Sequence, residues 1–328
     1  MFALLTGPDY LVLIVYLLTM VGMGIWFSRK QSTDDDYFLG GRRMPWFAVG
    51  LSVIASLLSS LTYLSEPGEV WNSGPTQYLG KMLAIPVEMA FVIIFIVPFM
   101  MRFRFTSAYE YLEYRFDRST RSLGVVLFLG MAVLWMGFVV FLSAKALATV
   151  TGFDLFWIII TMGFVATIYT ILGGLKAVIW TDVLQAVMLF GGVGVIIGYV
   201  MWSEGSGPAT WWEVIKADAN APDLVWFGGF DVFERTTVLW CVLSVLSWSC
   251  CTHCSDQVAL QRYFTTTSTT AARRSFVVSL LSAGLIGLLT ARELARAGCE
   301  ARVLDDSPPG RGSAQTGAGI WARVAGST

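Results

Sequence analysis

The sequence predicts an all-α membrane protein that crosses the bilayer several times. Hydrophobic residues make up 55% of the 328 positions, charged residues only 14%, and the mean hydropathy is +0.66. A soluble domain has about 25% charged residues, so this chain has too few polar side chains to cover a water-exposed surface. The apolar residues also gather in runs of roughly 17–25, the length that an α-helix needs to cross a bilayer. These observations predict a polytopic protein with about eight transmembrane helices.

Eight apolar runs account for this prediction. They are 10–28, 46–65, 79–101, 123–144, 155–172, 178–202, 236–254 and the shorter 276–291. The longest predicted loop is rich in Gly, Pro and Trp and lies between 203 and 235, with a short surface helix expected around 211–219. Beyond residue 298 the sequence is polar and no longer typical of a membrane segment.

Lysine and arginine residues predict the orientation of the helices, because cytoplasmic loops carry an excess of both. The loops after the first, third, fifth and seventh runs hold 13 of them, against three on the other side. The 13 are Arg29, Lys30, Arg42, Arg43, Arg102, Arg104, Arg115, Arg118, Arg121, Lys176, Arg262, Arg273 and Arg274. The N-terminus is therefore expected outside a plasma (inner) membrane. Because it lacks the features of a cleaved signal peptide, the first run is expected to be retained.

Composition also excludes several function classes. A net charge of −1 without a basic patch gives no indication of nucleic-acid binding. Five cysteines without framework spacing predict no disulfide scaffold. The first 280 residues contain no phosphate-binding loop and no nucleophile elbow. The sequence therefore indicates that the protein moves a substrate and is not an enzyme.

The run that begins near residue 45 is unusual for a membrane helix. Five polar side chains share one helical face, and two carboxylates with Pro67 and Gly68 follow near its end. The five are Ser52, Ser56, Ser59, Ser60 and Tyr63. Irregular backbone at membrane depth occurs where it lines a cavity, and broken helices of this kind form ion sites in transporters. Alternatively, the serines only allow neighbouring helices to approach closely.

Two further carboxylates lie in the predicted spans. Glu88 falls near the middle of the third span, where a charge costs a few kcal/mol, so it is a candidate functional residue. The alternative is that Glu88 is protonated or hydrogen-bonded to a neighbouring helix. Asp182 lies just inside the sixth span, where capping of a helix N-terminus is an alternative explanation.

A cluster in the seventh span contains potential metal ligands. Its members are Cys250, Cys251, His253 and Cys254. Zinc usually takes four ligands, commonly from two separated pairs, and here no second pair follows. Packing of small, polarisable side chains is therefore the preferred interpretation.

Three stretches carry a resemblance to a known family. The first, 166–192, contains the pattern GG-x-x-AV-x-W-TD-x-x-Q, which begins at Gly173 and includes Asp182. The second and third are the loops 106–121 and 256–275. On these residues, the chain over about 9–282 resembles the sodium:solute symporter family. The resemblance implies a five-plus-five inverted-repeat fold behind one leading helix, in which sodium drives the uptake of a small organic or anionic solute.

The family's binding residues can be carried onto this chain position by position. The resemblance implies that sodium binds the backbone carbonyls of Ala55 and Leu58, and that Asp182 lies on the sodium exit route. Neutral carbonyls suit this ion because a hard cation takes oxygen ligands. The resemblance also implies that the solute faces three hydroxyl side chains, those of Thr62, Ser249 and Thr252.

The last part of the chain departs from this family. The resemblance implies a second repeat, and the chain stops inside its second helix, so transport is expected to be impaired. Residues 283–321 resemble the start of FAD-dependent glycine and D-amino-acid oxidases, with a fingerprint that includes Gly284, Gly287 and Asp305. A working FAD site is not expected, because the catalytic and substrate-binding parts are missing. Alternatively, 276–291 simply continues as a membrane helix.

These inferences give a two-part organisation. Residues 1–282 are expected to form a truncated symporter domain, and 283–328 a chimeric tail that is not an independent domain. Sodium is the expected coupling ion, and no cofactor is expected. Two other functions remain open: a membrane-anchored fragment of an FAD oxidase, and a membrane scaffold that does not transport.

Overall fold

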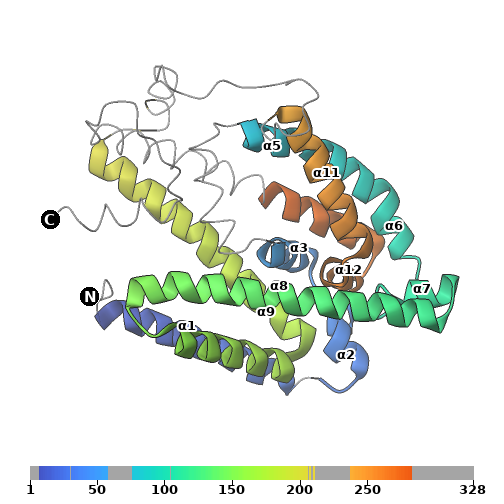
Figure 1. Cartoon of the computed structure of the whole chain (residues 1–328), viewed down its shortest axis with the longest axis horizontal. Helices are drawn as coiled ribbons and strands as arrows, with labels where there is room; N and C mark the ends of the chain where they lie inside the picture. The colour runs from blue at the N-terminus through green and yellow to red at the C-terminus, as the bar shows by residue number, and fades with distance from the viewer. Residues whose placement is uncertain are drawn as a thin grey trace.

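The computed structural model describes residues 7–29, 31–57, 76–103, 105–205, 207, 210 and 237–282, and this part of the chain is helical (Figure 1). The elements in order are α1 (Gly7–Ser28), α2 (Asp34–Leu39), the short η1 (Gly40–Arg42), α3 (Trp46–Leu57), α5 (Thr76–Phe91), the π-helical η2 (Val92–Ile96), α6 (Val97–Met100), α7 (Glu110–Arg115), α8 (Arg118–Thr151), α9 (Leu155–Glu204), α11 (Val238–Ser255) and α12 (Gln257–Phe264). Residues 269–282 form a further helix. Among the described residues, the β-type pairing is one isolated bridge, between Met44 and Thr266.

Five helical segments in the described residues are long and apolar enough to cross a membrane, and α3 is a shorter apolar helix. The sequence predicts about eight spans, and the described residues contain five, for identifiable reasons. Two predicted spans are joined into α9, the second predicted span is described only as far as Leu57, and the eighth only as far as Ser282. The predicted surface helix at 211–219 lies outside the described residues.

A bend at Gly174 divides α9 into two helices. A straight helix of 50 residues would be about 75 Å long, more than twice the thickness of the hydrocarbon core. Gly174 adopts φ 56° and ψ −166°, a combination that is essentially restricted to glycine. At this point the chain reverses its direction in Figure 1, so the two parts of α9 correspond to the fifth and sixth predicted spans.

Capping residues explain why α8 is longer than the predicted run 123–144. The Asp117 side chain accepts a hydrogen bond from the backbone N–H of Thr120 at 2.7 Å, and Gly152 ends the helix in a left-handed conformation. Both are standard helix signals. The last described helix also begins earlier than predicted, at residue 269 instead of 276. As a result, Arg273 lies on a helix, where its Nε donates to the Ile93 carbonyl at 3.1 Å.

The third predicted span has an irregular backbone. Pro86 lies inside α5 and removes one backbone donor, and six residues later the chain widens into the π-helical turn η2 before α6 continues. Glu88 lies between these two irregularities. Local widening of this kind is frequent at functional sites.

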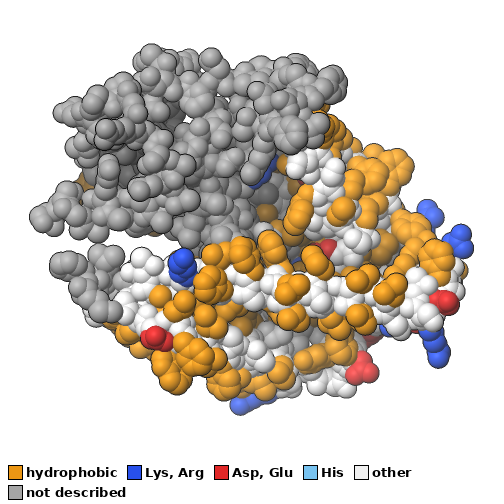
Figure 2. Space-filling view, in the orientation of Figure 1, with side chains coloured by type: hydrophobic (Ala, Val, Ile, Leu, Met, Phe, Trp, Pro, Cys, Tyr) orange, Lys and Arg blue, Asp and Glu red, His pale blue; other side chains and the backbone are white. Residues whose placement is uncertain are grey.

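Hydrophobic side chains cover much of the outside as well as filling the core. The core cluster includes Val49, Val53, Ile179, Tyr263 and Phe276. Outside it, α1 and α8 expose large apolar residues along their length. Figure 2 shows this apolar surface over α8, with several charged side chains near α7 and others at the opposite end of the molecule. A continuous apolar exterior is what a lipid environment requires and what a water-soluble surface avoids.

Candidate functional site

The centre of the candidate site is the carboxylate of Asp182, which lies two turns beyond the bend at Gly174. It is buried, and its Oδ2 accepts a hydrogen bond from Ser52 Oγ of α3 at 2.6 Å. Ser56 Oγ, one turn further along α3, lies 3.4 Å from the same oxygen and donates to the Ser52 carbonyl at 2.9 Å. Part of the predicted serine face of α3 therefore lies against Asp182.

Arg262 of α12 completes this cluster. Its Nη2 donates to Asp182 Oδ2 at 3.0 Å, and its Nε donates to Ser52 Oγ at 2.7 Å. Its remaining guanidinium nitrogen, Nη1, donates to the Val258 carbonyl at 2.8 Å. Only 6% of Arg262 is exposed. A buried ion pair persists only when its charges are matched and hydrogen-bonded, and each guanidinium nitrogen here has an acceptor.

This geometry corrects two interpretations of the sequence. Asp182 does not cap a helix N-terminus, because it lies eight residues beyond the bend at Gly174, inside the second part of α9. Arg262 is not a water-exposed loop cation, although it was counted with the loop residues that predict orientation. The available signal was its apolar surroundings, since its neighbours Leu260, Tyr263 and Phe264 are buried with it.

Glu88 belongs to a second buried cluster. Its Oε1 lies 3.5 Å from His253 Nε2 on α11, and His253 Nδ1 lies 3.0 Å from the Tyr263 hydroxyl on α12. Glu88 therefore faces an ionisable side chain of a neighbouring helix, α11. Burial raises the pKa of Tyr263 above the ordinary value of a phenol.

The four potential metal ligands of α11 do not face a common point. His253 is buried against Phe276, with the rings 4.8 Å apart, whereas Cys251 and Cys254 are exposed. Within the described ranges, no group of three or more His, Cys, Asp or Glu side chains is arranged to hold a metal ion.

The predicted solute-facing residues of α11 are both buried. Ser249 is 4% exposed and Thr252 is 6% exposed. In the part of the chain that the structure describes, Ser249 Oγ has no hydrogen-bond partner. A buried hydroxyl without a partner is costly, so this group can bind a ligand without first breaking another hydrogen bond.

Ala55 lies in α3, one turn beyond Ser52 and next to Ser56, the two serines of α3 that contact Asp182. The second predicted sodium-binding carbonyl, that of Leu58, lies outside the described residues, as does Thr62. The same holds for the predicted oxidase fingerprint of Gly284, Gly287 and Asp305.

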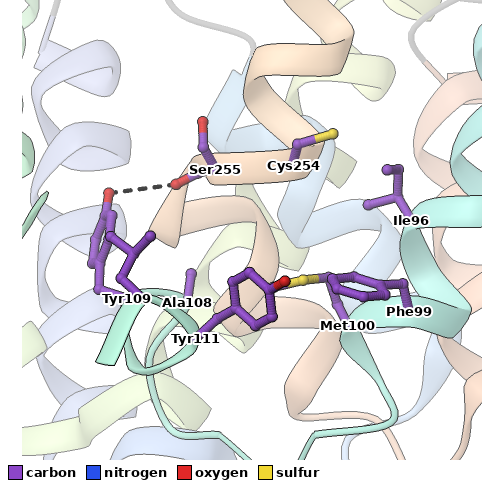
Figure 3. A pocket seen from close by; sticks show the side chains of 9 residues that line it. Ile96, Phe99, Met100, Ala108, Tyr109, Tyr111, Cys254 and Ser255 are labelled. Atoms are coloured by element: carbon purple, nitrogen blue, oxygen red, sulfur yellow. Dashed lines mark hydrogen bonds between the residues drawn. The ribbon is translucent and has the colours of Figure 1, made fainter. Parts of the chain in front are cut away.

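A cavity of about 200 Å³ lies beside the end of α11 (Figure 3). Its lining is mainly apolar and includes Phe99, Met100, Tyr111 and Cys254, and the Tyr109 hydroxyl donates to the Ser255 carbonyl at 3.4 Å. None of the predicted site residues that the structure describes lines it. The cavity therefore does not coincide with the predicted sodium or solute positions.

The three motif stretches and α3 meet in space. Asp182 comes from the first motif, Arg262 from the third, and Ser52 from α3. The third motif also contacts the second, because the Gln257 side chain accepts a hydrogen bond from the Ala108 backbone N–H at 2.7 Å. Figure 1 shows α2, α7 and α12 together on one side of the molecule. The segments that follow the odd-numbered predicted spans therefore share one face.

Comparisons with known proteins agree with this arrangement. The sequence matches the sodium:solute symporter family model over residues 37–297. It is 33% identical over 272 residues to the sodium/sialic acid symporter SiaT of Proteus mirabilis, covering 83% of this chain and 54% of that protein. It is 35% identical over 298 residues to human sodium-coupled monocarboxylate transporter 1, covering 86% of this chain and 46% of that protein.

A solved structure gives the same result for the fold. It is a substrate-bound, outward-open Na⁺-coupled sialic acid symporter, with a TM-score of 0.79 and 30% identity over 92% of this chain and 64% of that one. The chain spans about half the length of the curated relatives described above. The family match continues beyond Ser282 and includes Gly284 and Gly287, and nothing in the comparisons supports the oxidase resemblance. The chain belongs to the sodium:solute symporter family, whose members are transporters and not enzymes.

Proposed function

We propose that this chain acts in sodium-coupled symport of a small organic anion across the plasma membrane. The observation that carries the proposal is the cluster of Ser52, Asp182 and Arg262, which joins two of the three motif stretches to α3 at one buried point. The cluster places a carboxylate and two serine hydroxyls, which are oxygen ligands of the kind that a cation takes, beside the Arg262 guanidinium. Sialic acid and monocarboxylates, named for the relatives, both carry a carboxylate.

The proposed sites follow the family pattern. Sodium binds the carbonyls of Ala55 and Leu58 and leaves past Asp182, and the solute contacts Thr62, Ser249 and Thr252. The chain supplies the leading helix, the first repeat and the start of the second repeat, with the N-terminus outside. Residues 1–282 form this membrane domain, and 283–328 form the tail.

Sodium-gradient uptake tests the proposed function. The full chain is reconstituted in proteoliposomes, and uptake of labelled sialic acid or lactate is measured with sodium or with choline outside. We expect uptake to require external sodium. We also expect the Asp182→Asn variant to take up the solute more slowly than the unmodified chain. Equal uptake in sodium and choline, or no uptake above empty vesicles, would contradict symport and favour a membrane scaffold that does not transport.

Removal of the Ser249 hydroxyl tests the proposed solute contact. Since one neutral hydrogen bond contributes about 0.5–1.5 kcal/mol, Ser249→Ala is expected to weaken solute affinity roughly threefold to tenfold. The same change should leave thermal stability unaltered or slightly higher, because it removes a buried hydroxyl that has no partner among the described residues. Solute affinity and the unfolding midpoint are measured on the same preparation.

Ser247→Ala is the matched control on the same helix. Ser247 is exposed, and its Oγ donates to the Leu243 carbonyl of its own helix at 2.8 Å. The control should retain the affinity of the unmodified chain. A Ser249→Ala variant that loses stability while its affinity is unchanged would remove Ser249 from the solute site.

A further inference from the structure

The only histidine in the chain is buried where three helical elements meet. His253 lies on α11 and is 3% exposed. It contacts Glu88 of α5 and Tyr263 of α12, which are also buried. Histidine is the side chain whose charge changes near neutral pH. A fully enclosed histidine between an acid and a phenol is therefore positioned to respond to protons.

The two ring nitrogens have different partners. The Tyr263 hydroxyl lies 3.0 Å from Nδ1, and Glu88 Oε1 lies 3.5 Å from Nε2. When the imidazole is neutral and carries its proton on Nε2, Tyr263 donates to Nδ1, and Nε2 faces Glu88 Oε1 at 3.5 Å. When Nδ1 takes a proton, the imidazolium donates at both nitrogens, and Tyr263 changes from donor to acceptor. The same three side chains can thus hold either form without moving the helices.

Tyr263 keeps its own proton in both forms. Burial, and then the nearby Glu88 charge, raise the pKa of its phenol above the ordinary value. The groups of this cluster that can exchange a proton are therefore His253 and Glu88.

The other charged groups around His253 already have partners. Arg262 of α12, next to Tyr263, is paired with Asp182 at 3.0 Å. From the helix at 269–282, the uncharged ring of Phe276 packs on the imidazole, and Arg273 donates to the Ile93 carbonyl. On its own helix, Cys254 is exposed. Glu88 is thus the carboxylate that a protonated His253 meets directly.

We propose that Glu88, His253 and Tyr263 form a proton-binding site, in which His253 takes up one proton between the Tyr263 hydroxyl and the Glu88 carboxylate. The site lies outside the proposed sodium and solute contacts and does not depend on transport. Arg262 and Tyr263 are adjacent on α12. The proton-binding site therefore contacts the same short helix whose Arg262 binds Asp182.

A single isotope label tests this proposal, because only one histidine is present. The full chain, purified with a tag that contains no histidine, is labelled with ¹³C- and ¹⁵N-histidine and followed by NMR in nanodiscs from about pH 4.5 to 9. We expect one resonance set that changes with pH within this range and a neutral form protonated at Nε2. A resonance that does not titrate, or a neutral form protonated at Nδ1, would overturn the proposal.

Variants of the partners give the second part of the test. Glu88→Gln removes the opposite charge, so proton binding should weaken about tenfold or more and the titration midpoint should move to lower pH. Glu88→Asp retains the charge and should give a smaller change, which keeps the test valid if the glutamine variant folds poorly. Tyr263→Phe should alter the Nδ1 signal of the neutral form.

Two changes distant from the cluster serve as controls. Glu110→Gln removes an acid that is hydrogen-bonded to Thr106 in the loop before α7, and Tyr199→Phe removes an exposed hydroxyl on α9. Neither should move the midpoint. The variants of Glu88 and Tyr263 should change the His253 resonances, and the controls should not. If none of these variants changes them, the three side chains do not act as one proton site.

Discussion

Replacing Arg262 with glutamine is expected to destabilise the folded chain by about 3–5 kcal/mol, because the change leaves the Asp182 carboxylate buried without its counter-charge. The guanidinium supplies three hydrogen bonds, to Asp182, Ser52 and the Val258 carbonyl. Glutamine cannot replace all three and carries no charge. The effect is measured as a fall in the thermal unfolding midpoint of the purified chain in detergent.

Two comparisons separate this effect from general damage. Arg118 forms a surface ion pair with Glu113 at 3.0 Å and has a side chain that is 91% exposed, so Arg118→Gln should cost at most about 1 kcal/mol. The double variant Asp182→Asn with Arg262→Gln should recover part of the lost stability, because no unpaired charge remains. Equal losses for Arg262→Gln and Arg118→Gln would show that the buried pair contributes no more than a surface pair.

Replacing Gly174 with alanine is expected to prevent the normal bend in α9. The backbone conformation there costs a residue other than glycine about 1–3 kcal/mol. A Cβ atom at this position would also lie 2.7 Å from the Tyr37 carbonyl oxygen and 2.9 Å from its ring. Both effects act at the same residue, so we expect a strong reduction in the yield of folded, monodisperse protein, measured by size-exclusion chromatography after membrane extraction.

Gly191→Ala provides the control within the same helix. Gly191 lies in the second part of α9 with ordinary helical geometry, and a Cβ there would meet no atom within 4 Å. Alanine in a helix interior is favoured over glycine by about 0.5–1 kcal/mol, so this variant should be at least as stable as the parent. A Gly174→Ala variant with normal yield and stability would mean that the bend does not depend on glycine.

Much of the fold could be predicted because lipid imposes a simple rule on the sequence. Every side chain that faces hydrocarbon must be apolar for the length of a span, so hydropathy alone finds such segments. The run predicted at 236–254 corresponds to α11 (Val238–Ser255), and the run at 10–28 to α1 (Gly7–Ser28). The helix ends were less accurate where capping signals such as Asp117 and Gly152 were not used.

The candidate site could be predicted only in part. The intramembrane acids Glu88 and Asp182 were found because a carboxylate in a span is conspicuous. Their partners His253 and Arg262 were not found, because they lie far from these acids along the chain and no periodic pattern links the pairs. Counting arginines by loop also assumes that each one meets water, which Arg262 does not.

The eight residues of α12 have a consequence for how freely the sequence can vary. Five of them, Ala259, Leu260, Arg262, Tyr263 and Phe264, are buried. The side chains of Gln257 and Gln261 bind the Ala108 amide and the Phe38 carbonyl. Almost every position of this helix therefore has a specific neighbour, whereas much of α8 needs only to be apolar. Among natural variants and in saturation mutagenesis, we expect substitutions to be rare along α12 and common along α8.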